Sequence, residues 1–209
     1  MIDDQAGKLC SKKRNEFQSR YFPPVLEWQT WIHPITHCTY DITLQLSSTL
    51  SNQDFERCFS LVESTSSDHY KNSITGWNPP FKRNEMRHQD MKYVLVTLRG
   101  KLQGFMSFMP SYEDGIPVLY CYEIHLSSEL RGTGLARTLM QLLESVAAKI
   151  PTVEKVMLTC FTQNTRAFKF YTKIGYDIDP STPPIKQLRN GTKVGSDYMI
   201  LSKRINHSY

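Results

Sequence analysis

The stretch that most constrains the fold runs from Val118 to Arg137 and reads VLYCYEIHLSSELRGTGLAR. Its first half is apolar and aromatic with few turn residues, which is typical of a buried strand. Its second half places Arg131-Gly132-Thr133-Gly134 directly before a helical pattern, and free amides at a helix start bind phosphate. The stretch matches neither the Walker loop nor the GxGxxG dinucleotide fingerprint. It therefore predicts an anion-binding strand-loop-helix of another kind.

The composition fits one globular domain. The chain has 209 residues, 40% of them hydrophobic, and we find no apolar run of the roughly 18 residues that a membrane span needs. The N-terminal stretch is polar and lacks the apolar core of a secretion signal. Five scattered cysteines without a CxxC pair argue against a disulfide framework or a zinc site, and the histidines show no HExxH spacing, so no metal is expected. The net charge of +5 is compatible with an anionic ligand.

We expect an N-terminal extension, residues 1–36, packed on a single domain, residues 37–209. A helix over 15–21 would end at Pro23-Pro24, and the apolar segment after it carries Trp28 and Trp31 on one helical face. The cluster Lys12-Lys13-Arg14 is either a solvated face or a weak nuclear-import patch.

Hydrophobic periodicity predicts alternating helices and strands through the main domain. The expected strands are 39–46, 93–98, 102–108, 118–126, 154–161, 176–178 and 198–203, with 154–161 parallel to the strand before the glycine loop. The expected helices are 52–66, a short one within 81–90, 133–149 and 164–174, and the main loops are 67–80, 110–117 and 180–195.

A second motif follows the glycine loop. It reads Asn164-x-x-Ala167-x-x-Phe170-Tyr171-x-x-x-Gly175-Tyr176. Together with Arg131-x-x-Gly134-x-Ala136, it resembles the signature of the GNAT acetyltransferases. The resemblance implies an α/β (mixed α+β) fold: a mostly antiparallel central sheet with one splayed parallel pair, flanked by helices, plus the N-terminal helical arm. It also implies acetyl-CoA as the cofactor.

Four further segments narrow the resemblance: the Tyr120-Cys121-Tyr122-Glu123-Ile124 run, residues 155–159, the N-terminal arm and residues 196–201. They are similar to the D-type N-terminal acetyltransferases, which acetylate the alpha-amine of the Ser-Gly-Arg-Gly start of histone H4 and histone 2A. This implies direct transfer in a ternary complex, a monomer active without an auxiliary subunit, no direct nucleic-acid or membrane binding, and a place in nucleus and cytoplasm. Ser111 departs from the family, which has an acidic residue there.

The resemblance also implies the cofactor contacts. Amides of the glycine loop would hold the pyrophosphate, the backbone of the preceding strand would pair with the pantetheine arm, and an asparagine would hold that arm by its side chain. The residues are Ile124, His125, Leu126, Arg131, Gly132, Thr133, Gly134, Leu135, Ala136, Arg137 and Asn164. Two alternatives stay open: Arg137 as a solvent-facing helix residue, and Asn164 as the N-cap of its own helix.

The transfer needs a base for the incoming ammonium and an acid for the thiolate. Glu123 is the first candidate base, and it can face the site together with Tyr122 only if the strand is bulged. The alternative for Glu123 is a structural partner of a buried basic group. Glu113 is the second candidate base or a partner for the substrate arginine, with a solvated turn residue as the alternative. Tyr171 occupies the position of a general acid but can equally pack its helix onto the sheet.

The peptide pocket would be lined mainly by hydroxyl and aromatic side chains, which can bind peptide carbonyls while excluding water. The candidates are Tyr70, Trp77, Ser111, Tyr112, Glu113, Tyr122, Thr159, Ser181 and Tyr198. The long loop between Ser181 and Tyr198 would close over the substrate start. Two other functions remain open: a lysine or small-amine acetyltransferase, and an acetyl-CoA-binding module without catalysis.

Overall fold

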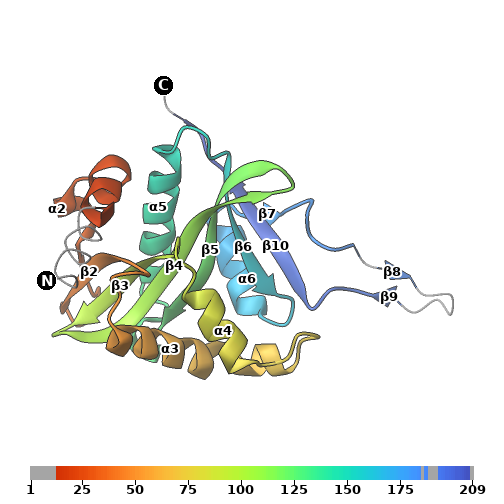
Figure 1. Cartoon of the computed structure of the whole chain (residues 1–209). Helices are drawn as coiled ribbons and strands as arrows, with labels where there is room; N and C mark the ends of the chain where they lie inside the picture. Colours follow the sequence, from red (N-terminus) through yellow and green to blue (C-terminus); the bar gives the residue numbers. More distant parts are fainter. Residues whose placement is uncertain (1–12, 185, 188–192, 208–209) are drawn as a thin grey trace, which may run out of the picture.

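A single eight-stranded sheet, in the order β1-β2-β3-β4-β5-β6-β10-β7, organises the computed structural model, which describes residues 13–184, 186–187 and 193–207 (Figure 1). All neighbouring strands are antiparallel except β5 and β6, which are parallel. This confirms the expected mixed sheet with one parallel pair. The strands are β1 Thr30–Ile32, β2 Thr39–Leu46, β3 Lys92–Leu98, β4 Lys101–Glu113, β5 Ile116–Leu126, β6 Lys155–Phe161, β7 Asp177–Ile178 and β10 Tyr198–Arg204.

Helices cover both faces of the sheet, and each face has its own core. The helices are α2 Val25–Trp28, α3 Asn52–Lys71, α4 Pro79–Met86, α5 Leu135–Ala148 and α6 Thr165–Lys173, with the short 3-10 helix η1 Ser128–Leu130 before the glycine loop. One core joins α5 and α6 to the sheet, and the other joins α3 and α4 to it. Successive side chains of a strand point to opposite faces, so Val94 belongs to the first core and Leu95 to the second.

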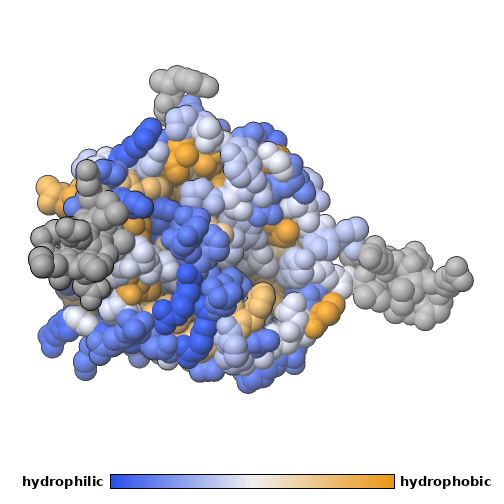
Figure 2. Space-filling model, in the orientation of Figure 1, coloured by the Kyte–Doolittle hydropathy of each residue, from blue (hydrophilic) through white to orange (hydrophobic). Residues whose placement is uncertain are grey.

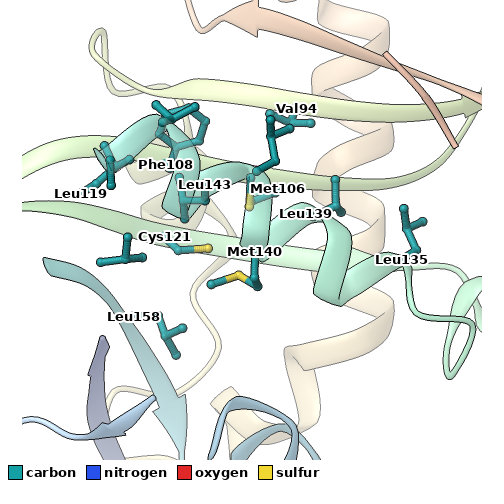
Figure 3. Close-up of a cluster of buried hydrophobic side chains, with 14 of the residues drawn as sticks. Val94, Met106, Phe108, Leu119, Cys121, Leu135, Leu139, Met140, Leu143 and Leu158 are labelled. Carbon is teal, nitrogen blue, oxygen red and sulfur yellow. The ribbon is translucent and has the colours of Figure 1, made fainter. Parts of the chain in front are cut away.

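The larger core forms where α5 crosses the sheet (Figure 3). Leu135, Leu139, Met140 and Leu143 of α5 lie over apolar side chains of the central strands. Leu135, which directly follows the glycine loop, is fully buried there. The position of the loop is therefore fixed by the packing of the helix that it opens.

The N-terminal extension packs on this core through Phe22 and Trp28, both buried. Residues 13–21 are helical, as expected. The placement of Trp28 and Trp31 on one helical face is wrong, because α2 ends at Trp28 and Trp31 lies in strand β1, opposite Tyr40 of β2. Pairing with a free sheet edge outweighed the local helical pattern. On the face shown in Figure 2, apolar residues form separate patches, one of them over α2, where Leu26 is 95% exposed.

Several other boundaries differ from the sequence prediction. Helix α3 runs on to Lys71, because no glycine or proline interrupts it, and Tyr70 therefore lies on a helix instead of in a loop. Strand β4 continues to Glu113, and the turn before β5 is only Asp114-Gly115, both with positive φ. The long loop after β7 contains a short hairpin of β8 Lys186–Gln187 and β9 Lys193–Val194. The predicted loop also includes positions 185 and 188–192, which lie outside the described residues.

Two irregularities of β5 open the sheet at the site. Its parallel pairing with β6 covers only Val118 to Cys121, and beyond that point the two strands separate. The register with β4 shifts between Ser107 and Phe108, opposite Tyr122. This is the bulge that the sequence required for Tyr122 and Glu123 to share a site.

Candidate active site

A cavity of about 570 Å³ lies where β5 and β6 separate, between α3, the glycine loop, α6 and the start of β10. It brings together most of the predicted site residues: Tyr70, Tyr122, Glu123, Ile124, His125, Leu126, Arg131, Gly132, Ala136, Thr159, Asn164, Tyr171 and Tyr198. Another group of predicted residues does not line it: Trp77, Ser111, Tyr112, Glu113, Thr133, Gly134, Leu135, Arg137 and Ser181.

The cofactor side of the cavity is made mostly of backbone. Gly132 and Gly134 have φ of 78° and 96°, and Gly134 is the N-cap of α5, where no side chain caps the helix. The amides of the first turn are therefore available to an anion. Arg131 donates from Nε to the carbonyl oxygen of Leu126 at 3.2 Å, which ties the loop to the end of β5. A helix start with free amides and a neighbouring arginine fits the pyrophosphate of acetyl-CoA.

Asn164 caps α6 by accepting a hydrogen bond at Oδ1 from the Ala167 amide, 3.1 Å away. It lines the cavity as well, so the cap does not remove it from the cofactor's reach. Arg137 is exposed, which fits the alternative interpretation that it is a solvent-facing helix residue and not a cofactor contact.

The acceptor side contains a buried group of charges around Glu123. Its Oε1 lies 2.7 Å from Nζ of Lys82 on α4, and its Oε2 lies 2.5 Å from Nε2 of His125. Burial raises the pKa of Glu123, but Lys82 and His125 outweigh burial and hold that pKa well below its usual range. Both carboxylate oxygens are therefore engaged. This arrangement fits the alternative interpretation, in which Glu123 is a structural partner of a buried basic group.

Two tyrosines of β5 lie beside this group, at the separation of β5 from β6. The hydroxyl of Tyr120 is 2.6 Å from Oγ1 of Thr159, and the rings of Tyr120 and Tyr122 are 5.1 Å apart. Burial raises the pKa of Tyr122, and the nearby carboxylate of Glu113 raises it further. Glu113 also raises the pKa of Tyr120, which burial and this charge bring to about 12 in spite of the Thr159 hydrogen bond. Both phenols are neutral at neutral pH and can donate hydrogen bonds.

Glu113 lies near the end of β4 and not in the predicted turn. It accepts a hydrogen bond from the Ser111 hydroxyl at 3.2 Å. Its charge raises the pKa of both Tyr120 and Tyr122, although Glu113 does not line the cavity itself.

Tyr171 reaches the cavity from α6. It is 7% exposed, and burial raises the pKa of its phenol well above the usual value, so the hydroxyl keeps its proton. Its ring also contacts Tyr176 at 5.9 Å between centroids. Tyr171 can therefore act as a proton donor and pack α6 onto the sheet from the same position.

The mouth of the cavity is held by a contact between two loops. Asp197 lies just before β10, and Ile74 lies in the segment between α3 and α4. The carboxylate of Asp197 accepts a hydrogen bond from the amide of Ile74 at 2.6 Å. In that segment Trp77 packs on Phe59 and Tyr70 instead of lining the cavity. Ser181 donates to Asp179, which pairs with Lys155 at 2.6 Å, and this group lies outside the cavity lining.

Sequence reasoning missed several site residues and one role. Four of these residues, Thr65, Lys82, Tyr120 and Asp197, make hydrogen bonds that arise only in the tertiary fold. Further unpredicted residues line the cavity, among them His69 and Arg166. The role is that of the His125 side chain, since only its backbone was expected to matter. Strand alternation placed His125 on the face of Glu123, two residues away, and was the one usable signal. Within the described residues, no group of three His, Cys, Asp or Glu side chains is arranged to hold a metal ion.

The fold, the free start of α5 and the cavity at the splayed strands define a class of acyl-CoA-dependent transferases. Residues 52–176, more than half of the chain, match the Acetyltransferase (GNAT) family, and the chain belongs to that family. In the part of the chain that the structure describes, we find no helix long and apolar enough to cross a membrane.

One relative is N-alpha-acetyltransferase 40 of Saccharomyces cerevisiae. It is 29% identical over 178 residues, which cover 72% of this chain but only 62% of the yeast protein. The structure of Arabidopsis thaliana NAA60 in complex with a bisubstrate analogue is similar with a TM-score of 0.56 and 15% identity, covering 80% of this chain and 99% of that one. The protein smu.2055 of Streptococcus mutans UA159 has a TM-score of 0.60 and 20% identity, covering 79% and 99%. These two likenesses show the fold.

Proposed function

We propose that the protein is an N-alpha-acetyltransferase that transfers acetyl from acetyl-CoA to the N-terminal serine of histone H4 and histone 2A, by direct transfer in a ternary complex. One observation carries this proposal: the glycine loop before the free start of α5 and Tyr122 of β5 line one cavity at the point where β5 and β6 separate. A donor and an acceptor can meet there without a covalent enzyme intermediate. The yeast relative named N-alpha-acetyltransferase 40 supports the same reaction.

The preference for a chain end over an internal lysine rests on the mouth of the cavity. The contact of Asp197 with Ile74 bridges the two segments beside it. A bridged mouth admits an extended N-terminus and hinders a side chain presented from the middle of a peptide. The structure of Arabidopsis thaliana Naa50, which was solved with the bisubstrate analogue CoA-Ac-MVNAL, has a TM-score of 0.51 to this chain and supplies a precedent for this fold.

Acetyl-CoA supplies the acetyl group as an activated thioester. In our proposal, Glu113 takes a proton from the substrate ammonium through water, beside Tyr122, because the carboxylate of Glu123 is already engaged. The neutral amine then attacks the thioester carbon, so that the C–N bond forms and the C–S bond breaks. The leaving thiolate takes the phenolic proton of Tyr171, and the second proton of the attacking nitrogen, relayed through water, returns to the Tyr171 oxygen. One amide in the stretch from Ile124 to Leu126 stabilises the oxyanion.

We further propose that the protein acts as a monomer without an auxiliary subunit, in nucleus and cytoplasm, and without direct contact to nucleic acid. The N-terminal extension supports the first point, since it adds β1 to the sheet edge and places Trp28 in the core. A sizing column combined with an activity assay tests it. Activity in a fraction of monomer size is expected, and activity confined to larger complexes would contradict it.

A peptide panel tests the proposed reaction. Ser-Gly-Arg-Gly peptides that also carry an internal lysine are offered with a free or a blocked N-terminus, and mass spectrometry locates the acetyl group. We expect acetylation of the alpha-amine of the free peptide only. Acetyl on the lysine of the blocked peptide would favour a lysine acetyltransferase. Binding of acetyl-CoA without turnover on either peptide would favour a non-catalytic module.

The assignment of the base is tested by Glu113→Gln, which keeps the shape and the acceptor oxygen for Ser111. Loss of a general base is expected to lower kcat about 10²- to 10⁴-fold. Asp114→Asn, at the exposed neighbouring turn position, is the matched control and should leave kcat near that of the wild type. A Glu113→Gln enzyme with wild-type kcat would remove Glu113 from the mechanism.

A further inference from the structure

A connected row of buried polar side chains runs from α4 through β5 to α3. Lys82, Glu123 and His125 are 5%, 8% and 7% exposed, and the row ends at Thr65. Glu123, His125 and Thr65 also line the cavity. Because buried polar atoms are hydrogen-bonded in native proteins, the position of each proton in this row can be deduced from its partners.

The proton of the Thr65 hydroxyl is fixed first. Oγ1 of Thr65 lies 2.6 Å from the carbonyl oxygen of Leu61, one helical turn earlier, and 2.5 Å from Nδ1 of His125. Two oxygens this close need a proton between them, and the carbonyl can only accept. The single hydroxyl proton therefore points to Leu61, and the hydroxyl oxygen must accept from an N–H at Nδ1.

The other ring nitrogen faces a carboxylate. Nε2 of His125 lies 2.5 Å from Oε2 of Glu123, and the second oxygen of Glu123 is bound by Lys82 at 2.7 Å. A carboxylate held by an ammonium is ionised and can only accept. Nε2 must therefore carry a proton as well.

We propose that His125 is held as a doubly protonated imidazolium between Glu123 and Thr65, and that it is a positioning residue: its charge cancels that of Glu123 at the cavity wall, so that the acceptor side does not favour an ammonium group. Other ionisable groups around the row leave this charge in place. Glu85 of α4 is 2.9 Å from Lys82 and offsets its charge. Tyr93 of β3 donates to the carbonyl of Met86, and burial together with the Glu123 charge raises the pKa of Tyr70 on α3 to about 12.

The functional half of this inference rests on the proposed function. Glu123 and His125 line the cavity with opposite charges, and Lys82 and Glu85 form a second pair behind them, so the row has no net negative charge that would stabilise an ammonium group. His125 keeps the row from favouring the ammonium form of the substrate, because without its charge the row would be net negative and would raise the pKa of the substrate amine. The amine is thereby presented in its nucleophilic form.

Nitrogen NMR of the histidine rings tests the charge state without any assay of activity. In protein labelled with ¹⁵N-histidine, the signals of His125 are identified by their loss in His125→Gln. We expect both ring nitrogens to be protonated between pH 7 and pH 8. Thr65→Val removes the acceptor and should give a neutral ring with one protonated nitrogen, whereas Thr65→Ser should keep the imidazolium. A neutral ring in the wild type at pH 7 overturns the proposal.

The pH profile tests the functional half. For His125→Gln, the acid limb of kcat for the peptide should move to higher pH by about one unit, because the uncompensated charge of Glu123 then favours the bound ammonium. The exposed His88→Gln is the control and should not move it. A purely structural role of His125 would lower kcat and leave the limb in place, which contradicts the positioning role. If the wild type acetylates no peptide, the proposed function fails, and the NMR result still decides the charge state.

Discussion

The two sides of the cavity are built on different principles. The cofactor side uses the backbone of a short continuous stretch, with glycines at Gly132 and Gly134 and the uncapped start of α5. The acceptor side uses side chains from several distant elements, and its centre is the ion group of Lys82, Glu123 and His125. Any residue that can adopt the backbone conformation of this loop provides a backbone amide, whatever its side chain. A buried ion group depends on the identity of each member.

This difference predicts where the molecule is most sensitive to substitution. The acceptor side should respond to the loss of any one charge with a large loss of stability. The cofactor side should respond only where a side chain is added to a glycine or where a hydrogen-bonding group is removed. Three sets of variants test the contrast, and we take them from the largest expected effect to the smallest.

Lys82→Met should have the largest effect on stability. Removing one partner of a buried ion pair leaves Glu123 uncompensated, which typically costs about 3–5 kcal/mol. We expect the free energy of unfolding, measured by urea denaturation at neutral pH, to fall by this amount. The shape of the side chain is largely kept, so a cavity contributes little.

The control for this variant is Arg83→Met, one residue further along α4. Arg83 pairs with Glu56 at the surface, where its side chain is 37% exposed, and such pairs contribute at most about 1 kcal/mol. Similar losses for the two variants would mean that the buried group around Glu123 is no more important for stability than an ordinary surface pair.

The same contrast explains what the sequence could predict. The sheet, the glycine loop and the cap at Asn164 follow from local patterns: strand alternation, glycines before a helix and an asparagine at a helix start. Parallel pairing of β5 with β6 followed from the helix between them. The cofactor side was therefore largely predictable, because its residues are neighbours in the chain.

The acceptor side was not predictable in the same way. Lys82 lies on a polar helix, and nothing in its surroundings in the sequence distinguishes it from Lys71 or Lys92. Its burial beside Glu123 results from the packing of α4 on β5. Likewise, Trp31 lies in strand β1 and not in the expected helix, because its segment pairs with the edge strand β2. Long-range packing decided both positions, and periodicity contains no information about it.

Gly134→Ala tests the cofactor side. A residue with a Cβ at φ of 96° costs roughly 1–2 kcal/mol, and the added methyl group would stand at the start of α5, where we expect the phosphates to bind. We expect a loss of stability in this range and a rise of about tenfold in KM for acetyl-CoA, with KM for the peptide unchanged. Steady-state kinetics and denaturation measure the two effects separately.

Gly100→Ala is the matched control. Gly100 has φ of 73° in the hairpin between β3 and β4, and, as at Gly134, no other atom lies within 4 Å of the position that an added methyl group would take. The backbone strain is thus similar, while the cavity is not touched. Gly100→Ala should lose comparable stability with no change in KM for acetyl-CoA. An equal rise in KM for both variants would attribute the effect of Gly134→Ala to strain instead of to the cofactor side.

Asn164 should show the smallest effects and separates two roles in one residue. Asn164→Ala removes the N-cap of α6, which is expected to cost about 1 kcal/mol of stability. Asn164→Asp keeps an oxygen for the Ala167 amide and should retain wild-type stability. It lacks the amide donor, so KM for acetyl-CoA should still rise by roughly two- to tenfold, as for one lost hydrogen bond. If Asn164→Asp matches the wild type in both stability and KM, Asn164 is a cap only, and the cofactor side is backbone throughout apart from Arg131.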